Sequence, residues 1–454
     1  MDNKNKRTVF CVLAAIQVTL IFTISLIFVP LPQIALEMGL QQSDLLLITA
    51  AYGLPYSGLL LFGGRLTDKY NVKNIFIIGS LIYALASLAD VFAANFELLV
   101  GLRFLQGVGG SLIAPSAIGI LKKVFTDESQ FKNAMAQWGV FSVLGAALGP
   151  VLGGAFITFI PWRWLFLIPF AISVTAFLFI KVRLVGINLS SVNADRLSLD
   201  ITGTILATLG ISTSSYALIV VDAYSWGSPQ VIVPLLTGLV LIVAFVLIEK
   251  TVSTPLLPLN YLLDKTRSIG LISIFLAAAA SSLSMFFLTL FLQQIKEWSP
   301  LETAGAYLPF AVILVVMNKY TMLMVQKWGT VTITLVGLLL STLSFAILSF
   351  IGYGSGFVVN LLPAYIVLPI GLSMIFAGSA VLSTANVETS EIGLAGGVMN
   401  TSMELGPTVG LAVFMSVAAL ETDVVSGYSL AFKTAGAVFA VMSLLLFLKK
   451  YRTK

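Results

Sequence analysis

The feature that most constrains this chain is a series of long apolar stretches, each bounded by charged residues or by Gly, Pro and Asn. About 20 apolar residues are enough to cross a bilayer as a helix. The predicted spans are 8–31, 45–64, 74–94, 97–121, 133–159, 163–183, 201–221, 230–250, 267–292, 303–324, 331–351, 358–383, 394–420 and 429–448. We therefore predict an all-α polytopic membrane protein with about 14 transmembrane helices, the first of them retained in the mature chain.

Composition agrees with this prediction and narrows the chemistry. Of the 454 residues, 58% are hydrophobic and only 10% are charged, whereas soluble domains carry roughly 25% charged residues. The chain has no histidine, which excludes Ser-His-Asp triads, His-ligated zinc or haem, and imidazole proton relays. Cys11 is the single cysteine, so no disulfide can form within the chain. We expect no enzymatic activity, no cofactor and no metal site.

Basic residues predict the topology. Lysine and arginine gather before the first span, in alternate loops and after the last span, and the intervening loops hold few of them. By the positive-inside rule, both termini are predicted to be cytoplasmic. The net charge of +5 is spread over these short loops, so we expect a multi-pass protein of the cell membrane and no nucleic-acid partner.

The longest polar stretch divides the chain into parts. It runs from about Gly186 to Asp200 and predicts a cytoplasmic linker over 186–200. The predicted parts are an N-terminal six-helix bundle over 1–185, an inserted helical hairpin over 201–250, and a C-terminal six-helix bundle over 251–454. The triplet Leu-Gly-Pro with a following Gly occurs in both the fifth and the thirteenth span, which suggests an internal duplication. Paired halves are typical of transporters.

The loop after the second span holds the first recognisable motif. It reads Gly64-Arg65-Leu66-Thr67-Asp68-Lys69-Tyr70-Asn71-Val72-Lys73 and resembles the cytoplasmic loop signature of the major facilitator superfamily. Asn71 replaces the usual later glycine, and asparagine can also adopt a left-handed turn. The resemblance implies a conformational gate formed by Gly64, Asp68, Lys69 and Lys73. A solvated loop with topogenic charges is the alternative.

The fifth span carries the most specific motif. Its segment from Gly145 to Gly154 matches G-x-x-x-G-P-x-x-G-G at every fixed position. Glycines four apart allow close helix contact, and a proline bends the helix. In the superfamily this pattern marks antiporters, chiefly drug exporters, and Trp162-Arg163-Trp164 also resembles the drug:H+ antiporter branch with fourteen spans. The resemblance assigns the antiporter motif to Gly145, Gly149, Pro150, Gly153 and Gly154.

Arg103 lies inside the fourth span, followed by Gln106 and three glycines. A guanidinium within the bilayer is costly unless it snorkels, is paired or faces water. The segment resembles the family's fourth-span signature, in which the arginine is linked to proton transfer. Asp90, near the outer end of the third span, is a possible partner, although an interfacial position for it is equally compatible with the sequence. Snorkelling toward the outer headgroups is the alternative for Arg103.

The coupling carboxyl is predicted at Glu404. Members of the fourteen-span branch commonly carry an acid in the first span, but Thr23 occupies that position here. Glu404 lies near the predicted bilayer centre, where low dielectric favours the protonated acid and a functional role is the default interpretation. We predict that Glu404, Arg103 and Asp90 couple transport to protons or cations. A permanently neutral Glu404, hydrogen bonded to Asn400, is the alternative.

Substrate contacts are predicted from aromatic, amide and methionine residues on spans expected to face a cavity. Such residues also pack every membrane helix, so each of them has a packing alternative. The candidates are Tyr52, Tyr56, Gln137, Phe141, Phe286, Tyr307, Phe310, Asn400 and Met403.

These features together predict a secondary active multidrug efflux transporter of the bacterial cell membrane. It would exchange small hydrophobic or cationic drugs for protons by alternating access and confer antibiotic resistance. A Na+-coupled antiporter and an exporter of lipid-like substrates are the alternatives within transport. A non-transporting membrane sensor is less favoured, because we expect neither a sizeable soluble domain nor an extended interaction tail.

Overall fold

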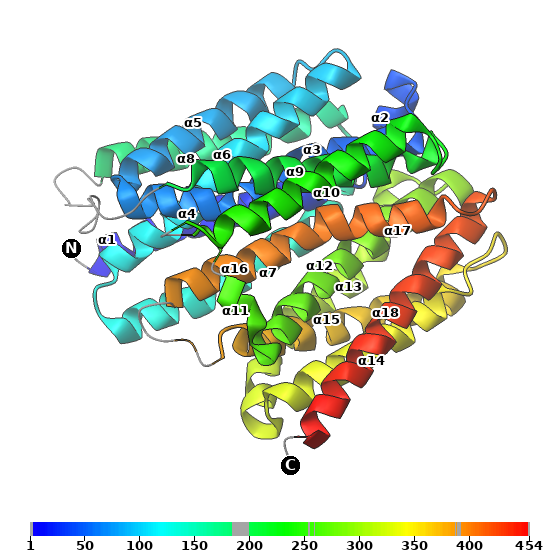
Figure 1. Ribbon diagram of the computed structural model, residues 1–454. Coiled ribbons are helices and arrows are strands. Elements are labelled where there is room, and N and C mark those ends of the chain that lie inside the picture. The colour runs from blue at the N-terminus through cyan, green and yellow to red at the C-terminus, as the bar shows by residue number, and fades with distance from the viewer. Residues whose placement is uncertain are drawn as a thin grey trace. The chain divides into compact units, whose positions relative to one another are not determined.

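The computed structural model describes residues 3–183, 199–252, 255–257, 259–385, 387 and 392–452. Within these ranges the regular structure is helical and contains no strand (Figure 1), which confirms the predicted all-α class. The first helices are α1 (Asn3–Leu26), α2 (Leu31–Met38), α3 (Gln42–Gly58), α4 (Leu60–Lys69), α5 (Val72–Asp90), α6 (Phe96–Val124), α7 (Glu128–Ile157), the 3-10 helix η1 (Trp162–Phe166) and α8 (Leu167–Arg183).

The remaining elements include short π-helical segments. They are α9 (Ile201–Ile219), the 3-10 helix η3 (Val220–Asp222), α10 (Pro229–Glu249), α11 (Leu259–Leu263), α12 (Lys265–Leu290), the π-helix η4 (Phe291–Ile295), α13 (Pro300–Trp328), α14 (Thr330–Leu348), the π-helix η5 (Phe357–Leu361), α15 (Leu362–Ser383), α16 (Ile392–Leu405), the π-helix η7 (Gly406–Gly410), α17 (Leu411–Ala418) and α18 (Val424–Arg452).

Fourteen membrane spans are not confirmed. Among the described residues, eleven helices are long and apolar enough to cross a membrane. Helices also occupy the predicted spans 133–159, 201–221 and 394–420, but these are not among the eleven. In the segment 133–159, only the shorter stretch Leu144–Ile157 of α7 qualifies as an apolar helix. In 201–221, α9 is rich in Thr and Ser, which lowers its hydropathy. The segment 394–420 is divided into α16, η7 and α17 around Gly406-Pro407.

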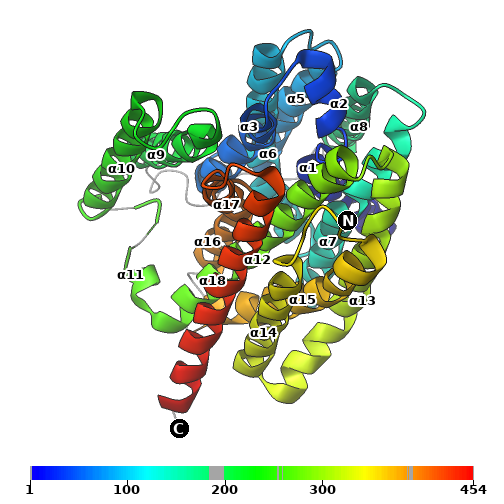
Figure 2. The ribbon, with the colours of Figure 1, turned by 90° about the vertical axis from the view of Figure 1, so that its right-hand side faces the viewer.

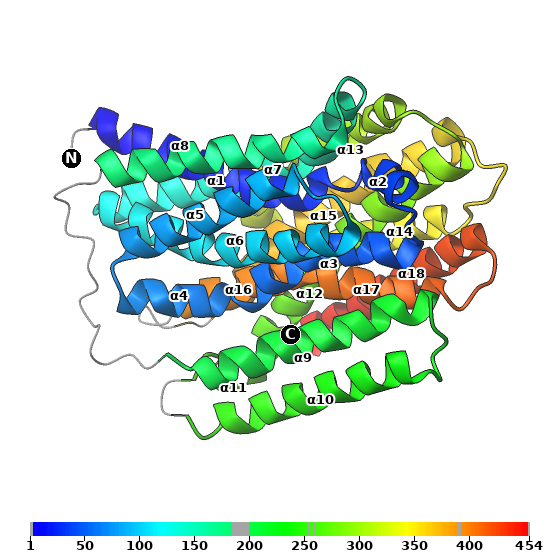
Figure 3. The same ribbon diagram turned by 90° about the horizontal axis from the view of Figure 1, so that it is seen from above.

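The chain forms two compact units. Unit 1 comprises residues 1–40, 47–212 and 238–257, and unit 2 comprises 41–46, 213–237 and 258–454. The helices of the inserted hairpin, α9 and α10, therefore contribute residues to both units. These two helices run side by side (Figure 3). They approach closely at Gly210 of α9, where an added Cβ atom would lie 3.1 Å from the backbone nitrogen of Ile242 on α10.

Glycines set the closest helix contacts of unit 1. A Cβ atom added to Gly145 on α7 would lie 2.5 Å from the carbonyl oxygen of Val18 on α1, and one added to Gly153 would lie 2.9 Å from that of Leu26. No real Cβ atom tolerates such distances, so these positions require glycine. Backbone approach of this kind lets small residues bring membrane helices together. The glycine face of α7 is thus its contact surface for α1.

Unit 2 repeats this arrangement with different helices. A Cβ atom added to Gly406 in η7 would lie 2.5 Å from the carbonyl oxygen of Phe275 on α12, so the second Gly-Pro motif packs on α12 as the first packs on α1. In the same unit, α14 packs against α15 (Figure 2), and Gly337 of α14 faces Gly371 of α15. The two Gly-Pro segments thus make similar close contacts in the two units, and the internal duplication stays a prediction.

The contact at Gly149 gives a direct test. We expect Gly149→Ala to lower the melting temperature of the purified protein, because its new methyl group would lie 1.9 Å from Ser25 Oγ and 2.8 Å from the backbone nitrogen of Leu26. Overpacking of this kind costs about 1–3 kcal/mol. Gly101→Ala is the matched control, since Gly101 lies in α6 with open space at its Cβ position. Equal melting temperatures for the two variants would contradict the proposed contact.

Candidate functional site

A buried polar network lies within unit 1 and is centred on Arg103 of α6. The Arg103 side chain is 0% exposed, so it does not snorkel to an interface. Its Nη1 atom donates to Gln106 Oε1 at 3.0 Å, and its Nε atom donates to the carbonyl oxygen of Ile48 at 3.4 Å. Its guanidinium carbon lies 4.9 Å from the ring centre of Tyr52. A cation–π contact and neutral acceptors therefore hold the charge inside the bundle.

The network continues from α6 to α5. Gln106 Nε2 donates to Ser87 Oγ at 2.7 Å, and Ser87 Oγ donates to the carbonyl oxygen of Tyr83 at 2.7 Å. Tyr83, Ser87 and Asp90 are spaced four and three residues apart, so they share one face of α5. Tyr83 and Ser87 were not predicted as site residues, although a row of polar residues at this spacing in an apolar span is a signal that indicates them.

Asp90 is the acid of this network and is 0% exposed. Neither of its carboxyl oxygens has a hydrogen-bond partner among the described residues, and the same holds for Arg103 Nη2. Asp90 and Arg103 attract each other electrostatically, but the ion pairs found in the described residues do not include them. A buried carboxylate without donors is costly, so this site suits an acid that carries a proton.

Thr23 links the first span to this network. Its Oγ1 atom lies 2.7 Å from the hydroxyl of Tyr83 and donates to the carbonyl oxygen of Thr19 at 2.8 Å. Since the threonine hydroxyl has one proton, Tyr83 donates to Thr23. A hydrogen bond between two neutral hydroxyls therefore occupies the position where the related branch commonly carries an acid.

Glu404 lies in unit 2 on α16, directly before the π-helix η7. It is 3% exposed, and its Oε1 atom has no hydrogen-bond partner among the described residues. No hydrogen bond to Asn400 is found there, so the alternative of an Asn400-bound glutamate is not supported. Pro407 lies in the π-helical turn that follows, and π-bulges are frequent at functional sites. Glu404 is thus a buried acid beside a π-helical turn, and its Oε1 atom has no partner among the described residues.

The predicted gate residues lie around the junction of α4 and α5. Asp68 is exposed at the end of α4, and Lys73 Nζ donates to the carbonyl oxygen of Lys181 at 3.1 Å. Asn71 does not adopt the left-handed turn that we considered. Its backbone is extended, and its side chain caps α5 by accepting from the Lys73 amide.

The glycine that the α4–α6 contact requires is Gly63. An added Cβ atom there would lie 2.2 Å from the carbonyl oxygen of Ser111, whereas Gly64 has open space. Arg65, the next residue, donates through Nη2 to the carbonyl oxygen of Pro255. Packing therefore does not explain a glycine at position 64.

The predicted substrate residues have different surroundings. Five aromatic side chains are buried within their own units, namely Tyr52, Tyr56, Phe286, Tyr307 and Phe310. The Tyr52 and Tyr56 rings are stacked, with centres 5.6 Å apart. Gln137 is exposed, and Phe141, Asn400 and Met403 are half-buried. Packing accounts for the five buried rings, and substrate contact remains a prediction for the whole set.

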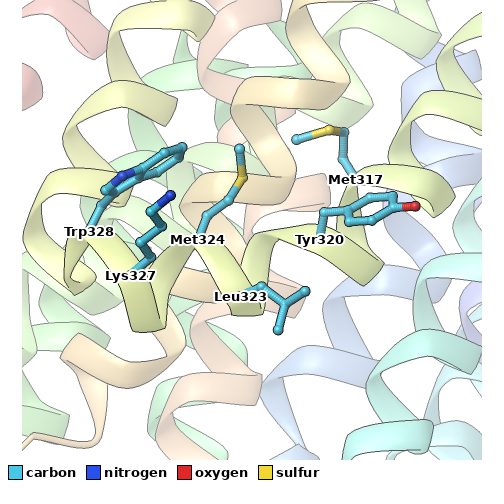
Figure 4. Close-up of a pocket in the computed structure, with 6 residues that line it drawn as sticks. All are labelled: Met317, Tyr320, Leu323, Met324, Lys327 and Trp328. Atoms are coloured by element: carbon cyan, nitrogen blue, oxygen red, sulfur yellow. The ribbon is translucent and has the colours of Figure 1, made fainter.

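A hollow with a volume of about 370 Å³ lies along α13. Six side chains of this one helix line it, namely Met317, Tyr320, Leu323, Met324, Lys327 and Trp328 (Figure 4). It contains none of the predicted substrate or coupling residues. All of its lining residues lie on one helix, and no polar groups converge on it, so it lacks the features of a ligand-binding pocket.

An ion pair joins α2 to η1, with its acid, Glu37, outside the candidate membrane spans and its base, Arg163, at the start of one. Glu37 accepts from Trp162 Nε1 at 2.7 Å and pairs with Arg163 Nη1. Arg163 Nη2 also donates to the carbonyl oxygen of Ala93 at 3.0 Å. The Trp162 hydrogen bond, followed by Arg163, holds the pKa of Glu37 below its ordinary value of 4.5. The Trp-Arg motif therefore ties α2 and the α5–α6 loop together.

A family comparison agrees with the architecture and the motifs. The Major Facilitator Superfamily pattern matches residues 12–411, and the chain belongs to this family of membrane transporters. The chain is 29% identical over 413 residues to the puromycin resistance protein of Streptomyces alboniger, covering 89% of this chain and 80% of that protein. It is 28% identical over 399 residues to a cephamycin export protein of Amycolatopsis lactamdurans, covering 87% and 82%.

Solved structures share the fold. The crystal structure of a peptide transporter in complex with sulfate superimposes with a TM-score of 0.70 at 16% identity, covering 99% of this chain and 94% of that one. At this identity the similarity concerns the fold alone. Together with the eleven apolar helices, these relatives identify a bacterial multi-pass membrane protein, and members of its family are generally not enzymes.

The Glu37 contacts predict a pH dependence of stability. Folding lowers the pKa of Glu37. The contribution of Glu37 to the free energy of unfolding is therefore complete above its unfolded-state pKa, and it is lost as the pH falls through the lower folded-state pKa. We expect Glu37→Gln to lower the melting temperature near neutral pH and to converge with the parent in acid. Thermal melting over a pH series measures this, with Glu421→Gln as an exposed control. A constant difference at every pH would contradict the ion-pair role.

Proposed function

We propose that this protein exports small hydrophobic or cationic drugs in exchange for protons. Support comes from the similarity to proteins described as antibiotic resistance and export proteins, and from the antiporter-type glycine face of α7. The proposed coupling rests mainly on Glu404, a buried acid beside a π-helical turn whose Oε1 atom has no partner among the described residues. The fourteen-span arrangement remains part of this proposal.

Glu404 serves as the proton-binding group. When it is neutral, burial is tolerated, and when it loses its proton, a bound cation can compensate the negative charge. Proton and cationic drug therefore compete for one acid, so one leaves before the other binds. This competition is the minimal requirement for exchange of the two across the membrane.

Arg103 and Asp90 form the second element of the coupling. The fixed charge of Arg103 lies close enough to act on Asp90 without bonding it, so gain or loss of the Asp90 proton changes the field inside unit 1. Asp90 supplies an ionisable acid beside a first span that has only Thr23 at the usual acidic position. The α5–α6 pair thus takes part in proton transfer.

The α4–α5 junction acts as the conformational gate. Asp68 and the basic residues Lys69 and Lys73 latch the cytoplasmic side, and the glycine face of α7 provides a contact on which α1 can roll as the transporter changes state. Both termini lie on the cytoplasmic side in this proposal. Alternating access then exposes the acids to each side in turn.

The first test concerns Glu404. Glu404→Gln keeps the volume of the side chain and removes its titration, so we expect no uphill drug accumulation driven by a pH gradient, while drug binding is retained. Efflux in proteoliposomes under an imposed pH gradient measures this, with protein content matched to the parent. Glu302→Gln is the matched control, because Glu302 is an exposed acid at the start of α13.

Two outcomes distinguish the alternatives. Full pH-driven accumulation by Glu404→Gln would remove this residue from the mechanism and leave Asp90 with Arg103 as the coupling pair. Accumulation by the parent under a Na+ gradient but not under a pH gradient would instead support Na+ coupling.

The second test concerns the gate. We expect Asp68→Asn to lower the transport rate about tenfold, equivalent to about 1.4 kcal/mol in the barrier, and to leave the equilibrium affinity for drug unchanged. Transport and binding measured on the same preparation separate the two effects. Equal losses of both would indicate misfolding or direct contact of Asp68 with the drug.

A further inference from the structure

We infer that Asp200 and Glu249 form a proton-binding carboxyl pair at the base of the α9–α10 hairpin. This site is separate from the coupling acids proposed above. Asp200 precedes the first turn of α9, and Glu249 is the last residue of α10. Both belong to unit 1, and they are 8% and 4% exposed. Two acids are thus buried at the point where the hairpin begins and ends.

Gly203 shows how closely the two carboxyls converge. A Cβ atom added to Gly203 would lie 2.3 Å from Asp200 Oδ2 and 2.8 Å from Glu249 Oε1. The two oxygens therefore lie near the same point over the α9 backbone, and the two side chains are close enough to share a hydrogen bond. The absence of a side chain at Gly203 provides the space that they occupy.

The backbone donors around the pair explain which oxygens need a proton. Asp200 Oδ1 accepts from the Gly203 amide at 2.8 Å, and Glu249 accepts from the amides of Leu256 at 3.2 Å and Leu257 at 3.1 Å. Asp200 Oδ2 has no donor among the described residues. Two buried carboxylates that face each other cannot both be charged without a large cost. One shared proton between Asp200 Oδ2 and Glu249 Oε1 removes this repulsion and supplies the missing donor.

The described charges nearby do not neutralise the pair. Lys250 follows Glu249 and is exposed. Arg65 of α4 contacts the same segment, but it donates to the carbonyl oxygen of Pro255, next to the two amides that Glu249 binds. The proton site is therefore adjacent to a residue of the predicted gate loop. With its proton the pair holds the two ends of the hairpin together, and without it the two charges repel them.

Infrared spectroscopy of the purified protein tests the pair without requiring transport. A protonated carboxyl gives a C=O stretching band that carboxylates lack, and the shared proton of the pair adds one such component to those of Asp90 and Glu404, which is isolated by subtracting the spectrum of each variant from that of the parent. Asp200→Asn and Glu249→Gln keep volume and hydrogen-bond acceptors, so both should fold. Each removes one of the two carboxyl groups between which the proton is shared. We expect each variant to lose the same band, and the double variant to lose no more than either single variant.

The control for this experiment is a variant of an acid outside the pair. Asp264→Asn removes an acid that also caps a helix, by accepting from the amides of Thr266 and Arg267, and should leave the band unchanged. An unchanged band in both Asp200→Asn and Glu249→Gln, or losses that add in the double variant, would overturn the shared proton. A band that appears only when Na+ is replaced by an organic cation would assign the site to Na+ instead.

Discussion

The structure depends on the fact that the bilayer interior offers no water to its backbone groups. Each amide and carbonyl must then be paired within the chain, which restricts a spanning segment of this kind to helix. Lipid is as apolar as leucine, so burial of apolar surface does not bring such helices together, and close backbone contact does. The glycines of α7 against α1, and of η7 against α12, provide these contacts in the two units. Their exact spacing matters more than their hydrophobicity.

The same constraint gives the buried polar residues their significance. A hydroxyl or amide inside a bundle needs a partner, and Thr23, Tyr83, Ser87 and Gln106 all have one. Asp90 and Glu404 have oxygens without partners in the described part of the chain. Keeping such acids is costly for stability, so their presence favours a function that requires protons to bind and leave. Among the buried groups of the described chain that lack a partner, which include hydroxyls such as Ser80 and Ser341, these two are acids that can gain and lose a proton.

Much of the fold could be predicted from the sequence, because hydropathy and helix length are local properties. The α7 glycine face was also predictable, since spacing alone defines a helix face. The packing of Tyr52, Tyr56 and Tyr307 in bundle cores was not, because span periodicity does not distinguish a ring facing a cavity from one facing a neighbouring helix. Tyr83 was missed since its partner Thr23 lies 60 positions away in sequence. The sequence could not show that Gly63, and not Gly64, makes the close contact with α6, because that contact depends on where the backbone of Ser111 lies.

The π-helical turns give the two units different mechanical properties. All three described π-helices, η4, η5 and η7, lie in unit 2. Such a turn accommodates one extra residue, and one residue corresponds to about 100° of helix rotation. The direction in which Glu404 points relative to α17 is therefore set by the bulge between them. A bulge that migrates by one position could reorient a side chain without breaking the helix, so unit 2 has a means of adjustment for which the described part of unit 1 has no counterpart.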